Sequence, residues 1–279
     1  MRGAGFRAYA AEGLGTFALV FIGVGAVTAN SITGHPGHLG IALSFGLVVA
    51  GVVYLFGPVS GAHINPAVTL ALAFAGRFPR RRVPGYLLAQ SLGALLAAGL
   101  LRASLGPATA AGATRATIAV APAFFLEIML TLFLMMVILA VVVSPQGRQV
   151  SGLAIGGAVF TGALWAGPLT GASMNPARTL GPALVAGDLS QLWLYMIGPV
   201  VGALLAVALF AAIRGEVSVP RSSGLRRLSP LTRILPAGTL LSRNLLSRTA
   251  RSARQLRPGG ARESLVVLEE GRHRGPMGL

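Results

Sequence analysis

Long apolar stretches separated by short polar segments fill the first three quarters of the chain. A helix needs about 20 residues to cross the hydrocarbon core of a bilayer, although tilt changes this number. Six stretches are near that length, at 8–31, 39–57, 83–105, 119–143, 151–168 and 190–213, and two shorter ones lie at 65–75 and 175–185. The pattern predicts an all-α membrane protein with six transmembrane helices and two half-helices.

Both short stretches begin with the same triplet, Asn65-Pro66-Ala67 in one and Asn175-Pro176-Ala177 in the other. Asparagine favours the cap before a helix and proline favours its first position, so each triplet predicts a helix start after irregular backbone. Irregular backbone at membrane depth occurs only where protein buries it or where it lines a water-filled cavity. One such triplet indicates no more than a helix start, but two in matching surroundings indicate a conduction or binding site.

The apolar region consists of two corresponding halves, 8–105 and 119–214. The first helix of each half carries a glutamate, Glu12 or Glu127, that is followed four residues later by a threonine. Because each half has three spanning helices, which is an odd number, the second half is expected to insert with inverted topology. The sequence therefore predicts an inverted repeat, with the site where the two halves meet.

Composition favours a polytopic membrane protein over a soluble domain, since 54% of residues are hydrophobic, 11% are charged and the mean hydropathy is +0.73. The absence of cysteine excludes disulfide and thiol chemistry. A net charge of +16 could indicate nucleic-acid binding, but 13 of the 23 arginines lie at or after Arg214, beyond the apolar part. We therefore assign 1–214 to a channel-like membrane domain and 215–279 to a basic, disordered tail. Within the tail, 225–256 could instead lie as a helix on anionic lipid.

The placement of arginines predicts the orientation. The loop 77–82 and Arg148 are basic, and the positive-inside bias places them in the cytoplasm together with the tail. The loop 33–38 contains no arginine and is expected outside. Both termini of this multi-pass protein are then cytoplasmic, and we expect it in the cell membrane.

The paired triplets, each preceded by Gly-Ala-x-x, resemble the signature of the aquaporin (major intrinsic protein) family over residues 8–214. The stretch 166–182 is especially similar to the nodulin-like intrinsic proteins and their bacterial relatives. This resemblance implies half-helices that meet at the membrane centre, one pore per subunit and a homotetramer in the lipid bilayer. It also implies passive passage of water and small uncharged solutes, with glycerol, urea and neutral metalloid acids as candidates. No cofactor, metal or nucleic-acid partner is expected.

The two triplets suggest how such a pore excludes protons. Each half-helix directs unpaired N–H groups and a positive dipole end to the pore centre, where the amides of Asn65 and Asn175 add donors. A water molecule there turns its oxygen toward both asparagines and cannot relay a proton, and the dipole ends repel cations. Extended backbone before each asparagine is expected to supply carbonyl acceptors, from Gly61, Ala62 and His63 and from Gly171, Ala172 and Ser173.

Arg178 follows the second triplet directly, and an arginine at membrane depth indicates function because it is costly there. The resemblance places it in an outer constriction with Phe45, Ala163 and Ala172. Strict water channels resemble one another in a histidine at the Ala163 position, so alanine implies a wider filter. The glycerol channels carry an aspartate where this chain has Thr179. That difference favours a strict water channel, which stays open as the alternative.

Glu12 and Glu127 are interpreted as structural carboxylates that accept hydrogen bonds from the loops before the half-helices. As charges within spans, they also make an ion-coupled secondary transporter the main alternative class, and a structural protein with a closed pore is a third. His63 is interpreted as a packed histidine, with pH gating as its alternative, and His35 and His38 as plain loop residues. Without a nucleophile–base set, a metal-ligand cluster or a phosphate loop, the sequence predicts no enzyme.

Overall fold

The structure, a computed structural model, describes residues 2–214, and the predicted tail with its stretch 225–256 lies outside the described residues. Six helices in the described part are long and apolar enough to cross a membrane. They are α1 (Arg2–Thr33), α2 (Gly37–Ser60), α4 (Val83–Leu105), α5 (Val120–Val143), α7 (Ser151–Thr170) and α9 (Leu192–Arg214). The half-helices are α3 (Pro66–Phe74) and α8 (Pro176–Ala186). The predicted fold class is confirmed, although α1 begins more than a turn earlier than expected.

Three short helical turns connect these helices without having been predicted. They are η1 (Arg80–Arg82), η2 (Gly106–Gly112) and α6 (Pro145–Gln149). The hydroxyl of Ser144 caps α6 by accepting the N–H of Gly147 at 3.1 Å. Turns of this length are too short to produce a recognisable apolar period in the sequence.

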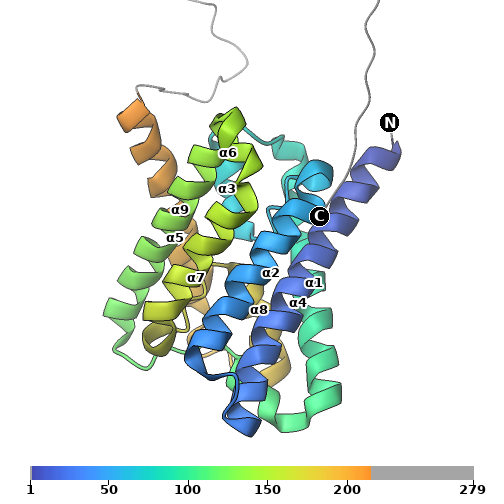
Figure 1. Cartoon of the computed structure of the whole chain (residues 1–279), viewed down its shortest axis with the longest axis vertical. Coiled ribbons are helices and arrows are strands. Elements are labelled where there is room, and N and C mark those ends of the chain that lie inside the picture. Colours follow the sequence, from blue (N-terminus) through green and yellow to red (C-terminus); the bar gives the residue numbers. More distant parts are fainter. Residues whose placement is uncertain (1, 215–279) are drawn as a thin grey trace, which may run out of the picture. The chain divides into compact units, whose positions relative to one another are not determined.

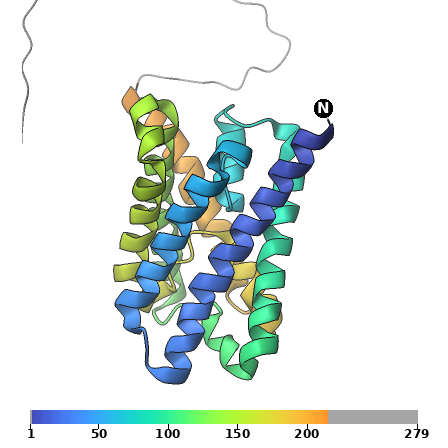
Figure 2. The ribbon, with the colours of Figure 1, turned by 45° about the vertical axis from the view of Figure 1, so that its right-hand side comes forward.

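The two halves enter the bundle from opposite ends (Figures 1 and 2). The start of α1, the loop after α3, α6 and the end of α9 lie at one end, whereas the loop between α1 and α2 lies at the other. We call the first the arginine-rich end, because it holds Arg7, Arg77, Arg80, Arg81, Arg82, Arg148 and Arg214. This arrangement is the inverted repeat that the odd number of spans predicted.

Glycines let helices touch backbone to backbone at equivalent places in the two halves. A Cβ atom on Gly93 of α4 would lie 2.1 Å from the carbonyl oxygen of Gly13 in α1. A Cβ atom on Gly202 of α9 would likewise lie 2.1 Å from the carbonyl oxygen of Ile128 in α5. Only glycine permits these contacts, which join the first and third spans of each half and hold them close in lipid.

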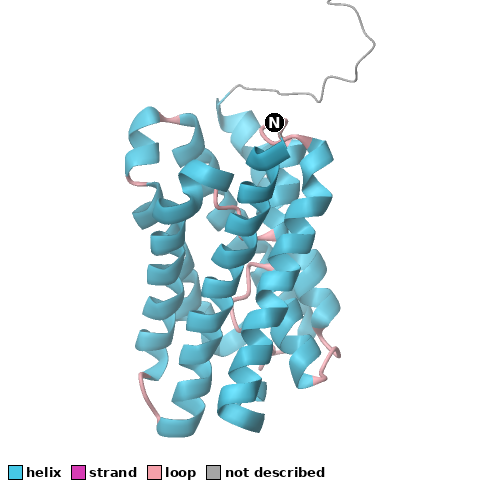
Figure 3. Cartoon of the chain, turned by 90° about the vertical axis from the view of Figure 1, so that its right-hand side faces the viewer, coloured by secondary structure: helices cyan, strands magenta, loops and turns pink. Residues whose placement is uncertain are grey.

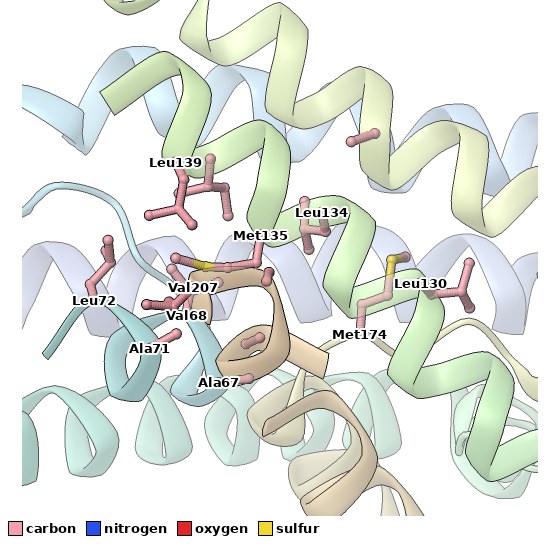
Figure 4. Close-up of a cluster of buried hydrophobic side chains, with 14 of the residues drawn as sticks. Ala67, Val68, Ala71, Leu72, Leu130, Leu134, Met135, Leu139, Met174 and Val207 are labelled. Carbon is pink, nitrogen blue, oxygen red and sulfur yellow. The ribbon is translucent and has the colours of Figure 1, made fainter. Parts of the chain in front are cut away.

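The half-helix α3 is embedded in the apolar core (Figure 4). Its residues Ala67 and Ala71 are completely buried, and they share one cluster with Met135 of α5 and Val207 of α9. Small side chains on α3 leave room for these larger neighbours, so the half-helix packs tightly without spanning the bundle. This packing fixes the start of α3 at mid-depth.

Candidate pore

Two loops interrupt the helices in the middle of the bundle, at 61–65 after α2 and at 171–175 after α7 (Figure 3). Each helix ends at a left-handed glycine, Gly61 with φ 91° and Gly171 with φ 79°. Further positive φ angles follow in each loop, at Ala62 (47°), Ile64 (44°), Ala172 (42°) and Met174 (54°). The loops are therefore not the regular extended segments that the sequence analysis expected.

A buried carboxylate explains this backbone in the second half. Glu127 of α5 accepts the N–H groups of Ser173 and Met174, both at 2.9 Å, and the hydroxyl of Thr170 at 2.8 Å. Alternating left-handed residues turn successive N–H groups to the same side, as in the nests that bind anions. The loop is thus shaped around Glu127, and its carbonyl groups are released from helical pairing.

The first half repeats this arrangement with one addition. Glu12 of α1 accepts the N–H groups of His63 and Ile64 at 2.9 and 2.6 Å. Gln90 of α4, which the sequence analysis missed, donates its amide to Glu12 at 2.8 Å and to the hydroxyl of Thr69 at 3.0 Å. A glutamine inside an otherwise apolar span was the signal that could have found it.

His63 is packed at the edge of the same network. Its Nδ1 lies 3.1 Å from the hydroxyl of Thr69, and its ring centroid lies 4.7 Å from that of Phe78 and 5.1 Å from that of Tyr86. The side chain is buried, so three neighbours fix the orientation of the ring.

Each asparagine joins its own half-helix to the opposite loop. Asn65 accepts the N–H of Ala67 at 2.9 Å, and Asn175 accepts that of Ala177 at 3.0 Å, so both cap a helix whose first residue is proline. The side-chain N–H of Asn65 donates to the carbonyl of Met174 at 2.7 Å. Because each amide carries two N–H groups, a second donor remains on each asparagine.

A cavity of about 590 Å³ passes these loops. Its lining includes both asparagines and all four residues assigned to the constriction, Phe45, Ala163, Ala172 and Arg178, whereas Gly171 lies outside the lining. Apolar side chains form much of the wall: Leu19, Val49, Val53, Val68, Leu134, Ile138 and Val159. A polar track of loop residues therefore runs along a largely apolar channel, which is typical of a selective site.

Arg178 is held from two sides. Its guanidinium carbon lies 5.0 Å from the ring centroid of Phe45, within the range of a cation–π contact. A Cβ atom on Gly23 of α1 would lie 2.1 Å from this ring, so Gly23 makes the space for Phe45. On its other side, the guanidinium donates to the hydroxyl of Thr114.

Thr114 is a site residue that sequence reasoning missed. It lies in the segment after η2, and its hydroxyl also accepts the hydroxyl of Thr179 at 3.1 Å. Thr179 in turn lies 2.6 Å from the hydroxyl of Ser173, so three hydroxyl groups form a chain behind Arg178. No motif in the sequence marks Thr114, because only the folded loop brings it to α8.

His38 also has a structural role that was not expected. It lies in the first turn of α2 rather than in a plain loop, and its Nε2 is 2.5 Å from the carbonyl oxygen of Leu164 in α7. Pro168, four residues later, has no N–H to pair with this carbonyl. His38 therefore contacts the backbone directly after Ala163.

Comparisons with known proteins agree with this geometry. Residues 2–210 match the family model described as Major intrinsic protein. Aquaporin NIP1-1 of Zea mays is 46% identical over 73% of either chain, and Nodulin-26 of Glycine max is 40% identical over 73% of this chain and 76% of its own. The X-ray structure of the aquaglyceroporin from Plasmodium falciparum superimposes with a TM-score of 0.68 and 28% identity, over 75% of this chain and 97% of its own.

Proposed function

The chain belongs to the major intrinsic protein (aquaporin) family, and we propose that its pore passes glycerol, urea and neutral metalloid acids in addition to water. It is an integral multi-pass membrane protein and a channel for water and small neutral solutes. The observation that carries the wider solute range is the constriction. Ala163 and Ala172 both line the cavity, and neither has a side chain larger than a methyl group.

The constriction suits a small molecule that carries both polar and apolar groups. Arg178 offers N–H donors to hydroxyl or carbonyl oxygens. Phe45 and the two alanines accept the carbon side of the same solute without competing for hydrogen bonds. The similarity to a protein described as an aquaglyceroporin supports this reading of the filter.

Proton exclusion in this proposal rests on Asn65 and Asn175. One N–H group of each amide is used in the bond to the opposite loop, and the second can donate to water in the cavity. Both half-helices begin directly after these asparagines, so their positive dipole ends lie at the same place. Water that accepts from both cannot pass a proton along the file, and the helix dipoles repel cations. Carbonyl groups of 61–63 and 172–173, which line the cavity, replace part of the hydration of a passing solute.

The orientation in the membrane follows from the arginines, and the oligomeric state follows from the family. We place the arginine-rich end and both termini in the cytoplasm and the protein in the cell membrane, because of the positive-inside bias. We also propose a homotetramer with one pore per subunit, a channel domain at 1–214 and no enzymatic activity.

Stopped-flow light scattering on proteoliposomes tests the solute range. An impermeant osmolyte measures water flux, and inward gradients of glycerol and urea measure solute entry. We expect fast water flux and solute entry well above that of empty liposomes, both abolished in an Ala163→Trp variant that blocks the constriction. Water flux without solute entry would establish the strict water channel instead.

The same vesicles separate a passive pore from an ion-coupled transporter. A passive pore gives fluxes that rise linearly with the solute gradient and do not change when an ionophore collapses a proton or sodium gradient. Saturating, gradient-dependent flux would favour the transporter, with Glu12 and Glu127 as its candidate ion sites.

A further inference from the structure

Four arginines gather where α1 and α4 begin. Arg7 lies in the first turns of α1, and Arg80, Arg81 and Arg82 form η1 directly before α4. The side chains of Arg7, Arg80 and Arg81 are exposed, and that of Arg82 is half-buried. We call these four residues the arginine corner.

Helix packing brings the two parts of the corner together. A Cβ atom on Gly85 would lie 2.7 Å from the ring of Tyr9, and the rings of Tyr9 and Tyr86 meet edge to face with centroids 5.7 Å apart. Tyr9 follows Arg7 by two residues, and Gly85 follows Arg82 by three. The segments that carry Arg7 and the three arginines of η1 therefore lie next to each other at the arginine-rich end.

No carboxylate among residues 2–214 neutralises this charge. That part of the chain contains three acidic residues. Glu12 and Glu127 are buried and bonded to the pore loops, and Asp188 pairs with Arg115 after α8, at the opposite end of the bundle. The corner thus carries a concentrated positive field that the described protein does not compensate.

The second half of the chain makes the corresponding connection without arginines. The equivalent connection in the second half follows α8 and also begins with a left-handed glycine, Gly187 with φ 73° against 70° for Gly76. That connection reads Gly-Asp-Leu-Ser-Gln over 187–191 and contains no arginine. The left-handed turn that begins each connection therefore does not depend on arginine.

Apolar side chains continue directly from the corner into the spanning region. Phe6 is 75% exposed beside Arg7, and Leu88 and Leu92 of α4 are 61% and 55% exposed. A positive cluster bordered by exposed apolar side chains matches the boundary between headgroups and acyl chains. We propose that the arginine corner binds the phosphate headgroup of an anionic phospholipid whose acyl chains lie against Phe6 and Leu88.

Native mass spectrometry of the purified protein, titrated with phosphatidylglycerol or phosphatidylcholine, tests this site. We expect tighter binding of phosphatidylglycerol and a loss of about fivefold for each corner arginine changed to glutamine, since one arginine near an anionic surface contributes about 1 kcal/mol. Replacement of the corner arginines by lysine should preserve the preference. The matched controls are Arg148→Gln with Arg214→Gln, at the same end but outside the corner, and Arg102→Gln, in the last turn of α4 at the opposite end.

Several results would overturn the site. Equal binding of the two lipids by the wild type would contradict it. An equal loss of phosphatidylglycerol binding in the control variants and the corner variants would also contradict it, because it would indicate a general positive field that only orients the protein in the membrane. Displacement of phosphatidylglycerol by an equal concentration of inorganic phosphate would assign the corner to a soluble anion instead. The variant in which all four corner arginines are changed to glutamine could fail to fold. In that case Arg81→Gln, at an exposed position, gives the same comparison of phosphatidylglycerol with phosphatidylcholine binding, and its unchanged water flux in phosphatidylcholine vesicles is the control for folding.

Discussion

Asn65 and Asn175 each donate a side-chain N–H to the residue that precedes the other asparagine. Asn65 reaches the carbonyl of Met174 at 2.7 Å, and Asn175 reaches the carbonyl of Ile64 at 2.8 Å. The same side chains cap their own half-helices. Each amide therefore stabilises both loops and still keeps one N–H group, so the centre of the pore is fixed by the residues that face it.

Replacing either asparagine by alanine should destabilise the protein and slow water passage. Loss of the cap and of the crossed hydrogen bond each removes about 1 kcal/mol. Thermal denaturation in detergent should show similar losses for Asn65→Ala and Asn175→Ala, because both lose a cap and a crossed bond and Asn175 loses only one further, long bond, from the N–H of Arg178 at 3.3 Å. Vesicle shrinkage should slow severalfold in both. Asn30→Ala is the matched control, since Asn30 accepts only the N–H of Gly37, between α1 and α2. Unequal losses would contradict the shared role.

The hydroxyl of Thr114 should control the position of Arg178. In Thr114→Val the guanidinium loses its hydroxyl acceptor, a contact to a charged group that contributes about 1.5–3 kcal/mol. The charge then turns toward water in the cavity, so glycerol permeability should fall severalfold, whereas Thr114→Ser keeps the wild-type value. Thr109→Val is the control, because the hydroxyl of Thr109 bonds within η2, to the carbonyl of Gly106. Equal glycerol flux in Thr114→Val and the wild type would refute this positioning.

A histidine at position 163 should narrow the constriction. Ala163→His places an imidazole ring in the cavity that Arg178 also lines, where the wild-type side chain is a methyl group. Glycerol and urea entry should fall by about tenfold or more, while water, which is smaller and pairs with both side chains, keeps passing. Trp165→His adds the same ring at an exposed position of α7 and should change neither flux. Unchanged glycerol entry in Ala163→His would show that the constriction lies elsewhere.

Local chemistry explains why the sequence could predict the spans and the half-helix starts. Pro66 and Pro176 are the first residues of α3 and α8, because the cap and the fixed φ of proline act within a few residues. Glu12 and Glu127 could be assigned partners as well, since a carboxylate in an apolar helix requires donors nearby.

Contacts that depend on the folded backbone could not be predicted in this way. Thr114 reaches Arg178 only because the segment after η2 is anchored, with Thr117 bonded to Leu169 and Ala116 bonded to Gln191. The left-handed Ala62 and Ala172 contradicted the expectation of extended loops, because alanine carries no local signal for positive φ. In both cases the tertiary environment decides the conformation.

The outer connection after α8 should make stability depend on pH. The hydroxyl and N–H of Ser190 bond to Asp188 and, together with Arg115, lower the pKa of its carboxyl group. A carboxylate whose pKa is lower in the folded state stabilises the protein above its ordinary pKa, and this contribution disappears as the pH falls through the lowered value. The denaturation midpoint of the wild type should therefore exceed that of Asp188→Asn at neutral pH and converge with it in acid. Because the Ser190 bonds are the larger cause, Arg115→Gln should lower the midpoint less than Asp188→Asn. A difference between wild type and Asp188→Asn that stays constant from neutral pH into acid would mean that the carboxylate has no such role.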